Sequence, residues 1–336
     1  MNVASHSFCE PTVPLAAASP LLGASAAMQE VFRLIERVGP TEASVLLTGE
    51  SGSGKELAAQ SIHDRSLRRG GPFIAINCGA IPAGLIEAEL FGYEKGSFTG
   101  AVRAHAGVFE RAHGGTLLLD EITEMPLDMQ TRLLRVLESR KFYRVGANLE
   151  YSTDVRVIAA TNRCPLQAVQ SGQLREDLLY RLAVFPIDLP PLRNRGSDVD
   201  LLAEHFLAEL NAQARTDKRF SALARMTLKQ HTWPGNVREL KNCIERAFIL
   251  GDQVLELAPL IQSAGATKGA DQPGDRERLD IRVGSRIYDM ERSLIEATLD
   301  YFQGNKRRAA DALGCSLKTL YNKLNGYSQS HECASS

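Results

Sequence analysis

The stretch Gly49-Glu50-Ser51-Gly52-Ser53-Gly54-Lys55-Glu56 decides the fold of this chain. It follows the apolar run Val45-Leu46-Leu47 and leads into residues 57–62, whose composition is typical of a helix. A strand, a GxxxxGK loop and a helix in this order form a P-loop, in which glycines let backbone N–H groups surround a phosphate. The positive end of the helix adds to this attraction, and Lys55 is placed to reach the β- and γ-phosphates. The stretch therefore predicts binding of a nucleoside triphosphate.

The loop departs from the general P-loop pattern at Glu56, because a Ser or Thr normally stands there and ligates magnesium. A glycine-rich turn without a ligand is the alternative interpretation. The complete spacing and the flanking strand and helix patterns favour the P-loop.

Length and composition set broad limits on the protein. The 336 residues are enough for two or three domains, and 39 basic against 40 acidic residues imply no global electrostatic partner. The six cysteines form no CxxC pair and are read as reduced thiols of a cytoplasmic protein. Neither a membrane-spanning run nor a signal peptide is predicted.

Short β-like runs alternate with helical stretches, which predicts an α/β fold with a parallel sheet. The runs are 44–48, 73–77, 116–120, 155–160 and 185–189. Ligands of such sheets bind at the carboxyl ends of the strands. Asn77, Asp120, Thr161 and Asn162 fall at these ends, so we expect them on the same edge as the P-loop.

After Pro190-Pro191 the β-like runs stop, and residues 197–212, 221–231 and 236–250 are predicted to be helices of a smaller domain. Asn236 is expected to cap the helix that carries Arg238. The predicted boundaries are a flexible arm at 1–21, the α/β domain at 22–190, the helical lid at 191–262, a linker at 263–283, a helix-turn-helix domain at 284–328 and a tail at 329–336.

Two adjacent carboxylates end the apolar run Gly114–Leu119. Asp120 can hold magnesium through water, and Glu121 can polarise the water that attacks the γ-phosphate. A solvated acid at a strand end is the alternative, but an acid pair that follows a P-loop favours a magnesium site at Asp120 and Glu121.

Arginines lie in Leu174–Arg181 and at the start of the helix after Trp233-Pro234-Gly235. Arg175 and Arg181 either form a charged helix face with Glu176 and Asp177, or stabilise the transition state of phosphoryl transfer in a neighbouring subunit. Arg238 is placed to contact the γ-phosphate from the lid.

Several motifs together resemble those of the bacterial enhancer-binding proteins, which are AAA+ ATPases that activate sigma-54 RNA polymerase. The shared motifs are residues 49–56 with their Glu56, Asn77-Cys78, Glu89-Leu90-Phe91-Gly92, Leu189-Pro190-Pro191-Leu192-Arg193 and Trp233-Pro234-Gly235-Asn236-Val237-Arg238-Glu239-Leu240. The resemblance implies an AAA+ domain that binds and hydrolyses ATP with Mg²⁺.

The same resemblance implies a role for each candidate site residue. Asn77 is similar to a switch that senses Glu121, and Arg238 is similar to sensor II. Thr161-Asn162 is similar to sensor I, while Arg175 and Arg181 are similar to arginine fingers.

Gly96-Ser97-Phe98-Thr99-Gly100-Ala101 has glycines near both ends, which permits a tight projecting loop with Phe98 exposed at its tip. A turn whose Phe folds into the core is the alternative. In the family this hexad has Ala where Ser97 stands, and it grips sigma-54 during ATP turnover. We expect the contact to survive this change.

Residues 304–324 carry five basic residues and one acidic residue, and they follow the pattern of a helix-turn-helix. Gly314 breaks the first helix, Ser316 caps the second, and Leu313, Leu317, Leu320 and Leu324 share one face. A small helical hairpin with solvated lysines is the alternative, but the segment resembles the Fis-type DNA-binding end of the same family. The expected DNA-binding residues are Lys306, Arg307, Arg308, Ser316, Lys318, Thr319, Asn322 and Lys323.

The resulting hypothesis is an ATP-hydrolysing transcription activator that remodels the sigma-54 polymerase closed complex. It is expected to bind an upstream activating sequence as a dimer, paired through an apolar stripe from Ile287 to Tyr301, and to form a hexameric ring. Since about twenty residues precede the ATPase domain, no receiver domain is expected, and control falls to expression level or to a regulator protein in trans. The alternatives are a sigma-70-type regulator with a nucleotide-driven oligomerisation module, and an AAA+ unfoldase or helicase.

Overall fold

The computed structural model describes residues 21–98, 100–257, 291, 294, 295, 298, 299, 305–321, 323 and 324. The predicted linker, the predicted tail and residues 1–20 of the predicted arm lie outside the described residues, as do Thr99 and Asn322. The chain divides into two compact units, residues 1–262 and 263–336. Each unit is described by itself.

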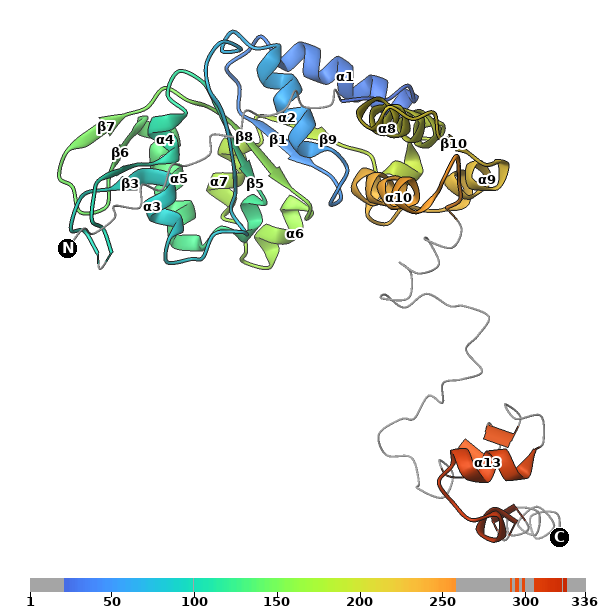
Figure 1. The fold of residues 1–336 in the computed structure, drawn as a ribbon. Helices are drawn as coiled ribbons and strands as arrows, with labels where there is room; N and C mark the ends of the chain where they lie inside the picture. Colours follow the sequence, from blue (N-terminus) through green and yellow to red (C-terminus); the bar gives the residue numbers. More distant parts are fainter. Residues whose placement is uncertain are drawn as a thin grey trace, which may run out of the picture. The chain divides into compact units, whose positions relative to one another are not determined.

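A five-stranded parallel sheet organises the first unit (Figure 1). Its strands in spatial order are β2 (Phe73–Asn77), β5 (Thr116–Asp120), β8 (Arg156–Thr161), β1 (Val45–Thr48) and β9 (Phe185–Asp188). The five predicted strands and the predicted α/β class are thus confirmed. Asn77 pairs with Asp120 and Thr48 with Thr161, so the expected residues share the carboxyl edge.

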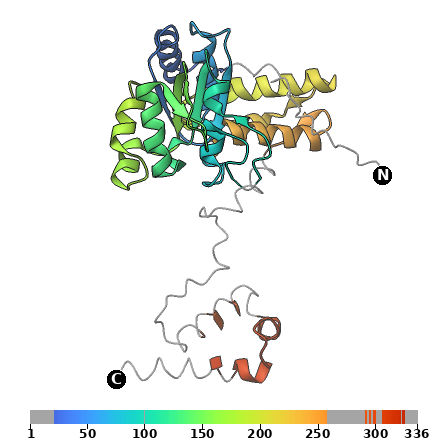
Figure 2. The same ribbon diagram turned by 90° about the vertical axis from the view of Figure 1, so that its left-hand side faces the viewer.

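Helices cover both faces of this sheet (Figures 1 and 2). On one face lie α1 (Ala26–Val38) and α2 (Lys55–Asp64), which pack on the side chains of Leu47, Leu118 and Ile158. On the other lie α3 (Ile86–Phe91), α4 (Val108–Arg111), α5 (Leu127–Ser139), α6 (Pro165–Gln170) and α7 (Glu176–Leu182). Because both faces are covered, the strands are apolar at every position except their ends.

Two short antiparallel ribbons project from the covered sheet. One pairs β3 (Gly92–Tyr93) with β4 (His105–Ala106), and the other pairs β6 (Lys141–Tyr143) with β7 (Glu150–Ser152). The loop at 96–101 lies between β3 and β4, so the ribbon fixes both of its ends.

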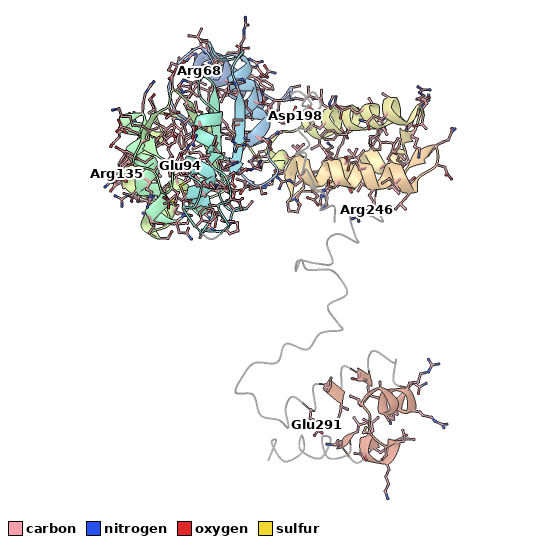
Figure 3. All side chains as sticks on the ribbon, turned by 60° about the vertical axis from the view of Figure 1, so that its left-hand side comes forward. Arg68, Glu94, Arg135, Asp198, Arg246 and Glu291 are labelled. Atoms are coloured by element: carbon pink, nitrogen blue, oxygen red, sulfur yellow. The ribbon has the colours of Figure 1, made fainter. Side chains whose placement is uncertain are left out.

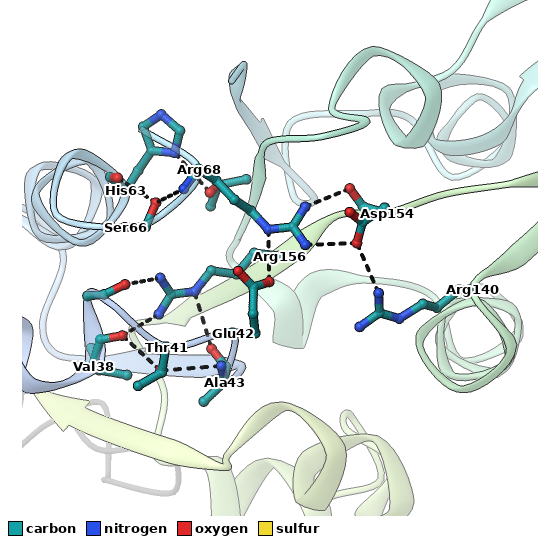
Figure 4. A network of polar contacts seen from close by, with 12 residues as sticks. Val38, Thr41, Glu42, Ala43, His63, Ser66, Arg68, Arg140, Asp154 and Arg156 are labelled. Carbon is teal, nitrogen blue, oxygen red and sulfur yellow. Dashed lines mark hydrogen bonds and ion pairs between the residues drawn. The ribbon is translucent and has the colours of Figure 1, made fainter. Parts of the chain in front are cut away.

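An arginine network holds the opposite edge of the sheet (Figure 4). Arg156, the first residue of β8, is 2% exposed and donates to the carbonyls of Val38 and Gly39 at 2.8 and 2.7 Å. It thereby satisfies the end of α1, where helix carbonyls lack partners. Arg68 pairs with both Glu42 and Asp154 at 2.8 Å, and its hydrogen bond lowers the pKa of Asp154.

The helical lid consists of α8 (Asp198–Ala214), α9 (Ala222–Gln230) and α10 (Asn236–Leu250), in agreement with the three predicted helices. It also contains the short pair β10 (Arg219–Phe220) and β11 (Val254–Leu255). Trp233 is fully buried at the centre of the lid, and its indole N–H donates to the carbonyl of Leu228 at 3.0 Å. The side chain of Asp198, labelled in Figure 3, accepts hydrogen bonds from the backbone N–H groups of Ala24 and Ser25, so the lid is joined to the start of α1.

The predicted cap at Asn236 is wrong. Gly235 is the N-cap residue of α10, and Asn236 is the first helical residue, with φ +54°. Its side chain contacts distant partners instead, as described below.

The second unit contains α13 (Lys306–Ala312) and a helical segment at 317–321. Gly314, with φ +67°, follows the first helix, and the Ser316 hydroxyl accepts from the N–H of Thr319 at 3.1 Å. The predicted break and cap are therefore present. Leu320 is fully buried, whereas Leu317 is 42% exposed, so the predicted four-leucine face is wrong at Leu317.

The predicted dimerisation stripe is described only at Leu294, which is 46% exposed. Residues 287, 290, 297 and 301 lie outside the described residues, so the stripe stays a prediction. Among the helices that the structure describes, none has the length and apolar character to cross a membrane.

Candidate nucleotide-binding site

The P-loop lies where the sequence predicts, between the end of β1 at Thr48 and the start of α2 at Lys55. Gly52 has φ +75°, and a Cβ atom there would lie 2.4 Å from the carbonyl oxygen of Gly235 in the lid. Glycine is therefore required both by the backbone conformation and by the close approach of the lid.

Lys55 is buried beneath this loop, with 7% of its surface exposed. Its ammonium group donates to the carbonyls of Gly49 and Glu50 at 2.8 and 3.3 Å. Burial lowers the pKa of Lys55, while the charges of Glu121 and Asp120 act in the opposite direction. The lysine follows β1 and the two acids lie at the end of β5 in the same parallel sheet, so all three lie at its carboxyl edge.

Asp120 ends β5, and Glu121 follows it directly, as predicted. The amide of Asn77 donates to Asp120 Oδ2 at 3.3 Å, and its carbonyl oxygen accepts from the N–H groups of Gly79 and Ala80. The expected contact of Asn77 with Glu121 is not made in this structure. Glu121 has φ +51°, which turns the backbone after the strand, and its carboxylate accepts instead from the N–H of Asn162 at 3.4 Å.

Glu121 is partly buried, and this burial, together with the charge of Asp120, raises the pKa of its carboxyl group. Thr161 is fully buried and lies against Thr123, with 3.1 Å between the two hydroxyl oxygens. The Thr161-Asn162 segment therefore contacts the acidic segment at two points, through Thr123 and through Glu121.

Lid residues hold the P-loop through contacts that sequence reasoning missed. Arg193 forms a bidentate ion pair with Glu50 at 2.6 and 2.8 Å, and Arg195 donates to the carbonyl of Ser53 at 2.5 Å. Asn236 donates to Glu50 Oε2 and to the carbonyl of Ser51, both at 3.1 Å. The motifs at 189–193 and 233–240 were the available signal, but they do not reveal which P-loop group each side chain reaches.

These contacts determine the ionisation of Glu50. Hydrogen bonds from Arg193 and Asn236 lower the pKa of Glu50 from 4.5 to about 2. Arg238 lies nearby, as predicted, and donates to the hydroxyl of Ser51 at 3.1 Å. The lid thus brings three cationic side chains, Arg193, Arg195 and Arg238, to the phosphate loop.

Arg175 and Arg181 contact no P-loop residue within the described part of the chain. Arg175 pairs with Asp177 at 2.7 Å, which is the local pairing named as the alternative. Arg181 donates to the carbonyl of Leu137 at 2.8 Å and pairs with neither Glu176 nor Asp177. Both side chains are exposed.

The loop at 96–101 is tight, as predicted. The N–H of Gly96 donates to the carbonyl of Ala101 at 2.9 Å, and Gly96 and Gly100 have φ +82° and +110°. Phe98 is 40% exposed, and its ring packs edge-on against Tyr93 with 4.9 Å between the ring centroids. Phe98 is therefore neither fully exposed nor part of the core.

The base of this loop is joined to the β6–β7 ribbon. Arg144, which is mostly buried, forms ion pairs with Glu94 at 2.9 Å and with Glu110 at 2.7 Å (Figure 3 labels Glu94). A Cβ atom at Gly146 would lie 2.7 Å from that of Ser97, so the two loops are in contact. The Ser97 hydroxyl is buried without a hydrogen-bond partner among the described residues.

In the second unit, the predicted DNA-binding side chains differ in their environment. Arg307, Arg308, Lys318 and Thr319 are exposed. Lys306 lies over the ring of Tyr321 at 4.6 Å, and Lys323 pairs with Glu291. Ser316 is engaged as the helix cap, while Asn322 lies outside the described residues.

Three family models match successive parts of the chain. Residues 21–188 match the sigma-54 interaction domain, residues 193–276 the AAA+ ATPase lid domain, and residues 287–327 the bacterial regulatory protein Fis family.

The chain is also similar to known regulators over most of its length. The chain is 45% identical to the transcriptional regulatory protein FlbD of Caulobacter vibrioides, over 92% of this chain and 70% of FlbD. It is 45% identical to NtrC of Azospirillum brasilense, over 91% and 69% of the two chains. The crystal structure of NtrX from Brucella abortus in complex with ATP has a TM-score of 0.71 and 34% identity, over 92% of this chain and 69% of NtrX.

The chain therefore belongs to the family of sigma-54-dependent bacterial transcription regulators with an AAA+ domain and a Fis-type helix-turn-helix. It is an ATPase and a DNA-binding transcription activator, and the predicted fold class and the predicted function as a sigma-54-dependent activator are confirmed.

Proposed function

We propose that this activator hydrolyses ATP at the carboxyl edge of the five-stranded sheet, where β1 and β5 end. We also propose that the loop at 96–101 transmits the resulting movement to sigma-54. The observation that supports the site most strongly is that the buried Lys55, which follows β1, and the acids at the end of β5 share the carboxyl edge of one sheet, under a P-loop held by lid arginines. Residues 49–56 bind the phosphates, Lys55 contacts the β- and γ-phosphates, and Glu121 orients the attacking water. Arg238, Thr161 and Asn162 complete the nucleotide site.

The residues present fit a magnesium ion only if the phosphates of the substrate also bind it. Among the described residues, no group of three or more His, Cys, Asp or Glu side chains could hold a metal ion by itself. Proteins usually bind magnesium through one or two carboxylates and the phosphates of the substrate. Asp120 and Glu121 would supply those carboxylates, and bound magnesium would neutralise charge on the phosphate oxygens.

The exposed arginines fit a role between subunits. Arg175 and Arg181 contact no P-loop residue of their own chain, and phosphoryl transfer gains about 10³–10⁵ in rate from an added arginine. We infer that a neighbouring subunit uses them, within a ring that is hexameric by likeness to the family. An Arg175→Ala variant should then be inactive alone and regain ATPase activity when mixed with Lys55→Ala subunits.

The remaining parts divide the other tasks. The exposed side of Phe98, together with Thr99, is proposed to contact sigma-54 in the cytoplasm. Lys318, Thr319, Asn322 and Lys323 are proposed to face the DNA major groove, with Lys306, Arg307 and Arg308 on phosphates. We also propose that the domains have the boundaries predicted from the sequence.

Two substitutions test the ATP site. Lys55→Ala should abolish nucleotide binding, whereas Asp120→Ala should keep binding and lose turnover, because magnesium acts mainly on the transition state. Nucleotide affinity and phosphate release are measured on both. Asp252→Ala, which removes an exposed carboxylate of the lid, is the control and should change neither. Wild-type turnover in the Asp120→Ala variant would refute the assignment.

A further inference from the structure

Gln130, the fourth residue of α5, is a fully buried polar side chain far in the sequence from the P-loop. All parts of its amide are used. Its nitrogen donates to the carbonyls of Met125 and Gln173, both at 2.8 Å, and its oxygen accepts from the N–H of Arg175 at 2.9 Å. Burial of a long polar side chain costs rotamer entropy. Because all hydrogen-bonding groups of the buried Gln130 amide have partners, we infer that its role is to fix the relative positions of those partners.

The partners of Gln130 belong to two different parts of the site. Met125 ends the short helix η1 (Ile122–Glu124), which follows Asp120 and Glu121 directly. Gln173 and Arg175 belong to the turn that begins α7, where Arg175 is the N-cap residue. One side chain therefore joins the acidic segment to the backbone of the arginine proposed to act in the neighbouring subunit.

A second contact reinforces the same connection. Arg163, which follows Thr161-Asn162, pairs with Glu124 at 2.5 Å and donates to the side chain of Gln173 at 2.5 Å. Both links connect the segment after Glu121 with the turn before Arg175. The Arg163 link is exposed, whereas the Gln130 link is buried, where a hydrogen bond is electrostatically stronger than in water.

We propose that Gln130 is a positioning residue that fixes the backbone of Arg175 relative to the Asp120–Glu121 segment. The inference rests on the proposed role of Arg175 between subunits. Each subunit would thereby couple the position of the arginine that it offers to its neighbour with the position of the acidic segment in its own nucleotide site. A displacement of about 1 Å from productive geometry costs up to about 10²-fold in rate. Loss of the link should therefore impair hydrolysis in the neighbouring subunit, which depends on Arg175, more than hydrolysis in the subunit that carries the altered Gln130.

Mixed assemblies separate these effects. Gln130→Met keeps the length of the side chain and removes all three hydrogen bonds, and its ATPase activity alone should fall about 10- to 100-fold. Mixed with Lys55→Ala subunits, which still offer an intact Arg175, the variant should regain activity. Mixed with Arg175→Ala subunits it should not, since neither partner then supplies a well-placed arginine.

The opposite pattern would overturn the inference. Rescue by Arg175→Ala but not by Lys55→Ala subunits would place the defect in the variant's own acidic segment. Absence of rescue by either would mean a general structural role. The Arg175→Ala and Lys55→Ala mixture is run in parallel, and if it shows no rescue, the proposed function of Arg175 fails independently of Gln130.

Two further variants keep the test decisive. Gln130→Asn retains the amide but is one methylene shorter, so it should show the same pattern of rescue with a smaller loss. Gln167→Glu changes an exposed glutamine on α6 and should behave as the wild type. If neither Gln130 variant unfolded cooperatively in thermal melts, Gln130 would be a requirement of the fold, and the inference would be wrong.

Discussion

At the scale of single residues, the ion pair between Glu50 and Arg193 addresses an electrostatic problem of this P-loop. A carboxylate stands in a loop that must hold a triphosphate, and like charges repel. Arg193 neutralises Glu50 through two hydrogen bonds, and Asn236 provides a third. The lid therefore stabilises the loop and also makes it electrostatically suitable for phosphate.

Removal of Arg193 should weaken nucleotide binding. In an Arg193→Gln variant the unpaired Glu50 repels the phosphates, and we expect ATP affinity to fall about tenfold, or ~1.4 kcal/mol. The double variant Glu50→Gln/Arg193→Gln should recover part of this loss, because both charges are then absent. Equal affinities in the single and double variants, measured by titration calorimetry, would contradict the repulsion argument.

The same pair has a defined pH dependence. Because the pKa of Glu50 is lowered to about 2 in the folded protein, the stability it contributes is present above its ordinary value of 4.5 and is lost as the pH falls through 2. The difference in unfolding free energy between wild type and Arg193→Gln should thus be constant from about pH 5 to 8. Denaturant melts across that range test this, and a difference that vanished near neutral pH would contradict it.

At the scale of elements, the loop at 96–101 carries the proposed contact with sigma-54. Phe98 is half-exposed, so Phe98→Ala should cost less stability than the ~3–5 kcal/mol of a buried aromatic. Thr99→Ala should keep folding, ATP binding and substantial hydrolysis, and lose promoter opening. Melting temperature, ATPase rate and promoter opening are measured together on each variant.

Ser97→Ala is the matched control within the same loop. It removes a buried hydroxyl without a partner among the described residues, and such a hydroxyl costs stability when it is unsatisfied. The variant should be at least as stable as the wild type and should still open the promoter. Loss of opening in all three variants alike would mean that the loop tolerates no change, and would remove the evidence for specific contacts.

The helix-turn-helix makes a prediction of its own. If Lys318 contacts a phosphate, Lys318→Ala should reduce the slope of log K against log salt by about 0.9. Lys229→Ala, on an exposed lysine of the lid, should leave the slope unchanged. An unchanged slope in Lys318→Ala would exclude Lys318 from the phosphate contacts.

The elements themselves were largely predictable from the sequence, because their signals are local. Leu117, Leu118 and Leu119 point to alternate faces, and since both faces are covered by helices the strand is a continuous apolar run. Asn236 shows where local rules fail. Its position after a glycine favours a helix cap, but its side chain is satisfied by Glu50, Ser51 and Leu192, which are distant in the sequence.

Gln130 was not predictable at all. A glutamine within a helix ordinarily faces solvent, and nothing in its neighbours indicates burial. Its partners are backbone groups of residues 125, 173 and 175, and backbone groups carry no sequence signature. The sequence therefore predicted the site residues that residue type and motif identify. It did not predict the residues, such as Gln130, that hold them in place through tertiary contacts.

At the scale of the whole molecule, the chain joins an ATPase to a DNA-binding domain. The central claim is that ATP turnover at Lys55, Asp120 and Glu121 drives the opening of promoter DNA by sigma-54 polymerase. An activator confined to DNA binding would not need this site, whereas a remodelling activator cannot work without it.

The most direct test is open-complex formation at a sigma-54 promoter, measured by permanganate reactivity of the melted strands with purified protein and sigma-54 polymerase. We predict opening with ATP, none with ADP or without nucleotide, and none with the Asp120→Ala variant in the presence of ATP. Opening by the wild-type protein without ATP, or full opening by Asp120→Ala, would contradict the account.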